Sequence, residues 1–377
     1  MGEGINLRRS GKQKKLPVLN ANYPADVTVE YNGNATFEVE IVEHGYPEEY
    51  TYQWYLDGEA VSSATNPSFT IYTNASSVGT HPIRCDVTNK AGTVQSRNAT
   101  LTVGTALPNY TFSGSHLLVD DGSGNWRILL KSTGTLKFTN RGTGVNGMDI
   151  YCLGGGAGGD GGGWNYSGGS GGGGGYTTNT YGVAIANKTN YACRIGAGGG
   201  GGTGGNLNYN SAGAGGTTEV LVHDTSAVVA RASGGNAGVI SGYYGDGGAG
   251  GSGGGGAGYS NGTAGKGGYN GGAGGTCTNG SRGNYGGAGQ GSTTGEFGSS
   301  VNAARGAGGG GGAGVSSGGT AGTAASGGSS WAGAGGATST GGSAQANTGC
   351  GGGGGGCKSS GNGGSGGSGI VIIRNKR

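Results

Sequence analysis

The sequence predicts an all-β protein built from two consecutive domains: a β-sandwich, and a glycine-rich β domain carrying a region of packed polyglycine II helices. Between Ala25 and Val103, apolar and polar residues alternate with the period of half-buried strands. Glycine makes up 103 of the 377 residues, and only 16 of these lie in the first 153. Ordinary soluble domains contain about 7% glycine. The composition therefore changes near Leu153, and the chain consists of two regions of different composition.

Residues 1–24 form a basic segment ahead of the first domain. Its cationic side chains face a single acid, Glu3, and are Arg8, Arg9, Lys12, Lys14 and Lys15. Such a cluster is either a solvated tail or a docking site for another protein. The formal net charge of the whole chain is only +3, which gives no electrostatic case for nucleic acid as a partner.

No apolar run follows these charges, so we expect no secretory signal. The longest aliphatic stretches, Val220–Val222 and Ile370–Ile373, are far shorter than the ~20 residues that a membrane span requires. The sequence therefore predicts a protein made in a cytoplasm without membrane insertion.

The first domain is expected to span residues 25–104. Turn residues that tolerate positive φ separate its apolar stretches, as at Asn32-Gly33 and Asp57-Gly58. The predicted strands are Val27–Glu30, Thr36–Val42, Thr51–Leu56, Ser68–Tyr72, Ile83–Thr88 and Val94–Val103. Short strands at this spacing are typical of a sandwich.

Two stretches of this domain are diagnostic. The run Tyr50–Gly58, with Trp54 at its centre, and the run Cys85–Asn89 resemble strands C and F of an immunoglobulin-like domain. The earlier strand has Phe37 and Val39 where a partner cysteine would be expected. We therefore predict a sandwich without a disulfide, in which Trp54 packs beside a free Cys85.

The second domain is expected to span residues 105–377. Glycine runs interrupt its strands rather than replace them. The predicted strands are Tyr110–Phe112, Trp126–Lys131, Thr135–Thr139, Met148–Leu153, Gly182–Ala186, Tyr191–Ile195, Thr217–Val222, Val228–Ala232 and Ile370–Arg374. The four-residue aliphatic run at the end is predicted to pair in the same sheet system as Met148–Leu153.

Residues 234–369 differ from the rest, because their aliphatic residues beyond alanine are only Val239, Ile240, Val301 and Val315. One interpretation is a flexible Gly/Ser linker. The other is an ordered bundle, since glycine recurs every third residue, as at Gly361, Gly364 and Gly367. That is the period of a polyproline II helix, whose amides must find partners outside the helix. All six prolines precede the region, which excludes collagen.

Several motifs in the second domain resemble the glycine-rich domain of bacteriophage tail proteins, in which an immunoglobulin-like module often comes first. They are Asn109–Gly114, Gly134–Phe138, Met148–Gly156, Gly174–Thr177, Cys193–Gly199 and Gly367–Arg374. The resemblance spans residues 105–377, and the region of predicted polyglycine helices is similar in kind to the tip adhesins of T-even-type phages. It implies a virion protein of the tail, assembled in the host cytoplasm and joined to other tail proteins through the N-terminal segment or the immunoglobulin-like domain.

No motif indicates catalysis, a metal or a cofactor. The GxSxG match at 258–262 is expected by chance in so much glycine and lacks the strand and helix that would support it. The four histidines are scattered, and the six cysteines form no CxxC pair. Carboxylates are too thinly spread for a glycosidase pair. We expect a protein that is not an enzyme.

Aromatic residues punctuate the glycine runs, where no ordinary core can receive them. They either staple the glycine region internally or bind a bacterial surface glycan or protein. The receptor-binding candidates are Tyr243, Tyr244, Tyr259, Tyr269, Tyr285, Phe297 and Trp331. Two functions remain open, a phage tail or tail-tip protein that attaches to the host, and a bacterial surface adhesin or matrix protein. The receptor, the host and the oligomeric state, a homo-oligomer included, are left open by the sequence.

Overall fold

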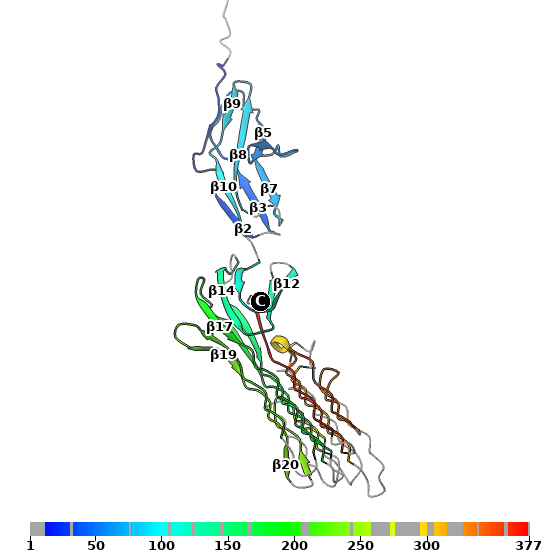
Figure 1. Ribbon diagram of the computed structural model, residues 1–377. Helices are drawn as coiled ribbons and strands as arrows, with labels where there is room; N and C mark the ends of the chain where they lie inside the picture. The colour runs from blue at the N-terminus through cyan, green and yellow to red at the C-terminus, as the bar shows by residue number, and fades with distance from the viewer. Residues whose placement is uncertain are drawn as a thin grey trace, which may run out of the picture. The chain divides into compact units, whose positions relative to one another are not determined.

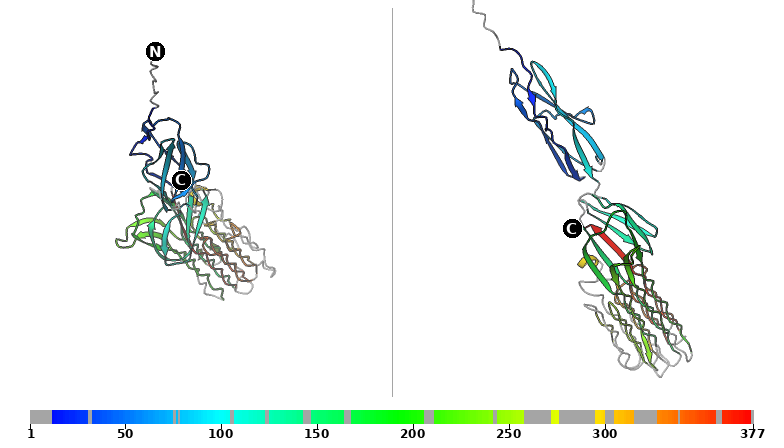
Figure 2. Two further views of the ribbon diagram at one scale, coloured as in Figure 1. Left: turned by 90° about the horizontal axis from the view of Figure 1, so that it is seen from above. Right: turned by 90° about the vertical axis from the view of Figure 1, so that its left-hand side faces the viewer.

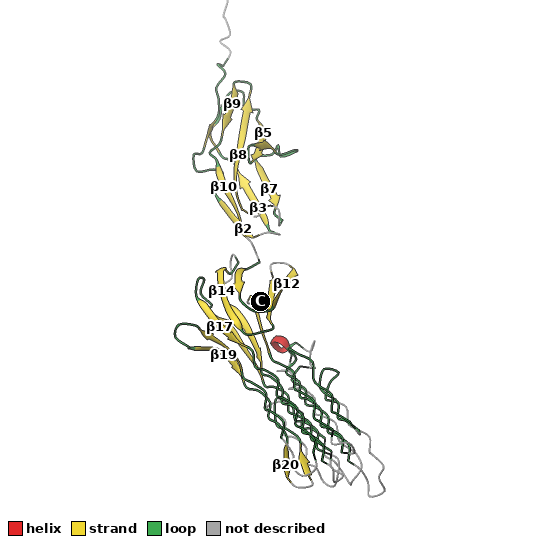
Figure 3. Cartoon of the chain, viewed as in Figure 1, coloured by secondary structure: helices red, strands yellow, loops and turns green. Residues whose placement is uncertain are grey.

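The computed structural model divides the chain into two compact units, Met1–Leu107 and a second unit comprising Pro108–Asp121 and Asn125–Arg377. It is all-β, with one single-turn helix among the residues that it describes (Figures 1 and 3). The structure describes residues 12–30, 33–74, 77, 79–104, 107–122, 125–142, 147–163, 168–205, 211–241, 244–257, 272–275, 295–299, 305–314, 327–337, 339–357 and 361–375.

The first unit is a sandwich of short strands. Its larger sheet has the order β2-β10-β8-β5-β6, with β9 paired to β8, and two-stranded sheets β3-β7 and β1-β4 complete it. The strands are β1 (Val18–Leu19), β2 (Val27–Glu30), β3 (Asn34–Glu38), β4 (Ile41–Glu43), β5 (Thr51–Leu56), β6 (Glu59–Ala60), β7 (Ser68–Tyr72), β8 (Gly79–Asn89), β9 (Gly92–Gln95) and β10 (Ala99–Gly104).

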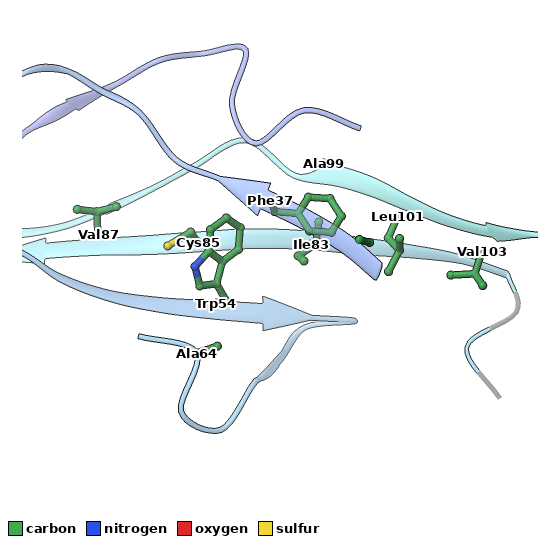
Figure 4. Packing of buried hydrophobic residues seen from close by; sticks show 10 residues of the cluster. Phe37, Trp54, Ala64, Ile83, Cys85, Val87, Ala99, Leu101 and Val103 are labelled. Atoms are coloured by element: carbon green, nitrogen blue, oxygen red, sulfur yellow. The ribbon is translucent and has the colours of Figure 1, made fainter. Parts of the chain in front are cut away.

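Trp54 is at the centre of the core of this unit, as the sequence predicts. It pairs with Cys85 across β5 and β8, its ring lies 6.4 Å from that of Phe37, and its indole Nε1 donates to the Asn66 carbonyl at 2.9 Å (Figure 4). Cys85 is a free, fully buried thiol. The sandwich is therefore closed by apolar packing and not by a disulfide.

Two boundaries in this unit differ from the predicted ones. The stretch expected as one strand, Thr36–Val42, is split, because β3 pairs with β7 while β4 pairs with β1. Residues 12–24, which the sequence sets apart from the sandwich, are joined to it, since the amides and carbonyls of Lys15 and Tyr46 bond reciprocally. The second half of the basic segment is therefore part of the folded unit.

The second unit contains two five-stranded sheets, with the orders β11-β14-β17-β18-β19 and β12-β13-β22-β15-β16. Their strands are β11 (Asn109–Phe112), β12 (His116–Gly122), β13 (Asn125–Leu130), β14 (Gly134–Asn140), β15 (Met148–Leu153), β16 (Thr177–Val183), β17 (Asn190–Arg194), β18 (Thr218–Val222), β19 (Val228–Ala232) and β22 (Ile370–Asn375); a small hairpin, β20 (Val239–Ser241) and β21 (Tyr244–Asp246), and the helical turn η2 (Glu296–Gly298) complete the unit.

The sequence misses β12 and places β16 too late in the chain. The strand predicted at Gly182–Ala186 ends instead at Val183, because Gly182 adopts a φ of 64° and donates its amide to the Asp149 carboxylate. β12 has no clean alternation of apolar residues, which explains why the pattern did not reveal it.

The C-terminal strand β22 is confirmed in the predicted sheet, where it lies between β13 and β15. Its register with β15 pairs Leu153 with Ile370 and Tyr151 with Ile372, and all four side chains are buried. The last described strand, β22, therefore holds a central position in its sheet.

Between the strands the chain forms extended glycine runs that lie side by side (Figures 1 and 2). They are neither α-helix nor β-strand and are coloured as loops in Figure 3. Several continue directly from a sheet strand: run 154–163 follows β15, and run 361–369 leads into β22. The runs thus extend the two five-stranded sheets of the second unit in the direction of their strands.

The hydrogen bonds of run 154–163 show a threefold helical repeat. Each of three successive amides donates to a different neighbouring run, and every third amide returns to the same one, with N to O distances between 2.8 and 3.0 Å. The donor–acceptor pairs are Gly156–Gly367, Gly159–Gly364 and Gly162–Gly361; Gly155–Gly216 and Gly158–Gly213; and Ala157–Gly173 and Asp160–Ser170. This is the arrangement of a polyglycine II helix, which has three residues per turn and no internal bonds.

The runs are packed hexagonally. Three central runs, 154–163, 168–175 and 349–357, bond to one another, and each is bonded to six neighbours in all. Around them the described outer runs form a closed ring in which each bonds to the next, in the order 196–205, 211–216, 233–238, 247–251, 252–257, 305–314, 327–337, 339–345 and 361–369. The region predicted as either linker or lattice is, in its described parts, an ordered lattice.

At most positions where a run faces another run, only glycine fits, although small side chains such as those of Ala157 and Ser170 are also buried there. A Cβ added at Gly354 would overlap the carbonyl oxygen of Gly169, and one at Gly201 would overlap that of Gly363. Where a run faces solvent the restriction ends, and in run 361–369 the exposed third positions carry Asn362 and Ser365. The three-residue period of the sequence therefore reflects which residues face a neighbouring run and which face solvent.

We predict that Cys85 resists alkylation in the native protein. Burial raises the pKa of this thiol to about 12, so it is neither ionised nor accessible at pH 8. Mass spectrometry should find Cys85 unmodified after treatment with iodoacetamide under native conditions and modified after unfolding. A disulfide from Cys85 to any other cysteine contradicts the structure.

Deletion of residues 370–377 should abolish cooperative unfolding of the second unit, because it removes the strand between β13 and β15. The transition of the first unit, whose sheets do not include β22, should be unchanged. Calorimetry on the full and truncated chains measures both. A second-unit transition that survives at the same temperature refutes the role assigned to β22.

Neighbouring glycines provide a matched test of the lattice. Gly201→Ala should lower the free energy of unfolding by about 1–3 kcal/mol, the usual cost of forcing an extra carbon into packed structure. Gly200→Ala should be neutral or slightly stabilising, because a Cβ there meets nothing within 4 Å and alanine restricts the unfolded chain. Denaturant unfolding of both variants decides the matter, and equal losses would contradict the packing.

Candidate functional site

The aromatic residues proposed for recognition fall into two groups. Tyr243, Tyr259, Tyr269 and Tyr285 lie outside the described residues, and for Tyr244 the structure describes only the backbone, which begins β21. Phe297 and Trp331 are described with their surroundings. Both lie where the glycine region meets the five-stranded sheets of the second unit.

Phe297 packs against the sheet that contains β15 and β22. Its ring lies 6.2 Å from that of Tyr151, and the Arg374 guanidinium stacks on it at 4.0 Å. Its amide donates to the Asn179 side chain at 3.2 Å. η2 thus covers the outer face of β15, which explains why every residue of that strand is buried.

Trp331 is connected to the same region by a cation–π contact and a series of ion pairs between side chains. The Arg305 guanidinium lies 5.6 Å from the Trp331 ring centre and 3.0 Å from one oxygen of Glu296, whose other oxygen lies 2.8 Å from Arg127 of β13. Arg127 also pairs with Asp121 at 3.0 Å. Glu296 and Arg305 are 7% and 9% exposed, so this is a buried network.

This network fixes the start of run 305–314 to the sandwich. Removing one partner of a buried ion pair leaves an uncompensated charge and is strongly destabilising. Phe297 and Trp331 therefore staple the structure internally, which is one of the two roles that the sequence leaves open. No local pattern indicates this network, because Glu296 is separated from Arg127 by 169 positions.

Several described runs end at the opposite end of the lattice. Gly163 and Gly205 end two such runs and form a parallel bridge, and the β20–β21 hairpin also lies at this end (Figure 1). Val239 of the hairpin is 63% exposed. In sequence, Gly163 is followed by Trp164 and Tyr166, Gly205 by Tyr209, and β20 by Tyr243, all outside the described residues.

The buried thiols of the second unit are chemically quiet. Cys152, Cys193, Cys350 and Cys357 are buried and form no disulfide, and burial raises the pKa of Cys193 to about 12. Within the described ranges, no three His, Cys, Asp or Glu side chains are placed to hold a metal ion. No helix in the same residues is long and apolar enough to cross a membrane.

Two solved structures align with parts of the chain at low similarity. The insect immune protein hemolin aligns at 19% identity over 32% of this chain and 34% of its own length, with a TM-score of 0.20. A quinonprotein alcohol dehydrogenase-like protein from Bacteroides thetaiotaomicron aligns at 11% identity over 58% of this chain and 50% of its own length, also with a TM-score of 0.20. The chain thus spans about a third and a half of these two proteins, and so low a score supports no argument about fold or function.

No curated protein matches the chain. The model of one family, described as a glycine-rich domain, matches residues 131–376. The match begins in the loop between β13 and β14 and ends just after β22, so it includes every described glycine run. Because it covers more than half of the sequence, the chain belongs to the glycine-rich domain family.

Proposed function

We propose that this chain is a structural protein of a bacteriophage tail or tail tip that attaches the particle to the surface of its host. The observation that carries the proposal is the hexagonal bundle itself, in which main-chain bonds hold many glycine runs side by side. A rigid support whose turns are free to differ in sequence is suited to recognition, because binding residues are commonly found on loops held by a fixed scaffold.

The distribution of aromatic residues supports the same proposal. Phe297 and Trp331, the two whose surroundings are described, already pack against Tyr151 and Arg305 where the lattice meets the sheets of the second unit. Tyr243 follows β20 at the opposite end, and Tyr259, Tyr269 and Tyr285 lie in segments 258–271 and 276–294. Tyrosine side chains offer a large contact area and a hydroxyl group, which suits glycans and protein surfaces alike. These four tyrosines, together with Tyr244, are accordingly the binding candidates that we retain.

Attachment to the rest of the particle is assigned to the first unit. Lys12 and Lys15 are exposed, Lys15 pairs with Glu43 of β4 at 3.1 Å, and β1 pairs with β4. An ordered basic edge of this kind suits an acidic partner protein. The proposal therefore gives the two units different partners: another tail protein for the first and a bacterial surface glycan or protein for the second.

The test is binding of fluorescently labelled full-length chain to a panel of bacterial species, measured by flow cytometry. On a species that is bound, replacing Tyr243, Tyr269 and Tyr285 together by alanine should weaken binding about 30-fold or more, since truncation of an aromatic anchor commonly costs ~2 kcal/mol. The melting temperature should be unchanged.

Phe297→Ala is the matched control. It should lower the free energy of unfolding by about 2 kcal/mol, because the ring packs on Tyr151 and Arg374. Its affinity for cells should be that of the parent chain at temperatures where both are folded. Failure to bind any species, or full binding by the triple variant, rejects the receptor assignment. Detection of the chain in the envelope of uninfected bacteria, and not in purified virions, would favour a bacterial surface adhesin.

A further inference from the structure

A buried carboxyl group lies within the glycine lattice, close to its far end. Asp160, in the central run 154–163, has no exposed surface, and neither has its neighbour Ser170. One carboxyl oxygen accepts the Ala212 amide at 2.9 Å, and the other accepts the Ser170 hydroxyl. Three runs, 154–163, 168–175 and 211–216, are therefore joined by one side chain.

Asp160 fits because a neighbouring run leaves the lattice beside it. Closer to the sandwich, a Cβ on Gly154 would overlap the carbonyl of Ser233, so run 233–238 packs tightly there. Beyond Asn236 the chain turns into the β20–β21 hairpin. A Cβ on Gly238 would meet Asp160 Oδ2 and Ser170 Oγ, which shows that these two polar groups fill the space next to the departing run.

The surroundings of Asp160 favour its neutral form. Burial, the largest effect, raises the pKa of this carboxyl, and the bonds from Ala212 and Ser170 offset it only in part. The runs packed against it, 168–175, 211–216 and 233–238, contain no ionisable side chain, and β21 contributes Tyr244 and Asp246. No cation in these elements compensates a negative charge.

We propose that Asp160 is a proton-operated latch, which holds Gly238 and the β20–β21 hairpin against the central runs while its carboxyl group is protonated. Ionisation in place would bury an unpaired charge, so the ionised form favours an opened end in which water reaches the carboxylate. The hairpin that carries exposed Val239 is thereby released as pH rises. This inference concerns the fold and holds whether or not the chain binds a host cell.

The direction of the pH dependence follows from proton linkage. The closed form has the raised pKa and binds more protons than the opened form, so closure is most stable below the ordinary aspartate pKa of ~3.9. Above that value the opening equilibrium should rise by about tenfold per pH unit, until the pKa of the closed form is reached. Beyond it the opening equilibrium should level off.

Amide hydrogen exchange of the full-length chain between pH 4 and pH 8, corrected for intrinsic rates, measures this opening. Protection of residues 236–241 and of Ala212 should fall as pH rises, while the central run 349–357 stays protected. Asp160→Asn, which keeps the shape without the charge, should make the protection of 236–241 independent of pH. Asp246→Asn should behave as the parent chain.

The parent chain alone can overturn the proposal, even if Asp160→Asn does not fold. Protection of 236–241 that is constant with pH, or that increases, excludes the latch. An equal pH dependence in the parent and in Asp160→Asn excludes Asp160 as its origin. Loss of the pH dependence in Asp246→Asn assigns the effect to β21 instead.

Discussion

The fold depends on one interaction, the hydrogen bond from a main-chain amide of one glycine run to a main-chain carbonyl of another. Ordering a residue costs about 1–2 kcal/mol of backbone entropy, and a typical hydrogen bond contributes about 0.5–1.5 kcal/mol net. A glycine run with a single neighbour therefore cannot be stable, since only every third amide would be paired. The hexagonal arrangement pairs the amides of the central runs in every direction, and stability comes from all the neighbours together.

This dependence explains why the glycine region needs the sandwich. Run 154–163 continues β15, and run 361–369 leads into β22, so the two sheets set the spacing and direction at which the runs begin. Phe297 and the network of Glu296, Arg305 and Arg127 hold the start of a further run at the same place. Apolar and ionic packing at one end thus supplies the order that main-chain bonding extends outward.

The same constraint decides where side chains are allowed. Facing positions are mostly glycine with a few other small residues such as Ala157 and Ser170, exposed positions take small polar residues, and larger groups occur where a run starts, ends or leaves the lattice. Asp160 belongs to the last class, because it occupies the space beside run 233–238 as that run turns into β20.

Local periodicity and the need to bury apolar side chains were enough to predict the all-β class, the disulfide-free core around Trp54 and a place for residues 370–374 in the same sheet system as Met148–Leu153. The period of three indicated polyglycine helices but left a flexible linker open, since glycine carries no side chain from which a neighbour could be inferred. Only the tertiary structure decided which runs are central. It also showed that the Arg374 and Arg305 guanidinium groups lie over the rings of Phe297 and Trp331. Those contacts join residues far apart in the chain, and no local pattern encodes them.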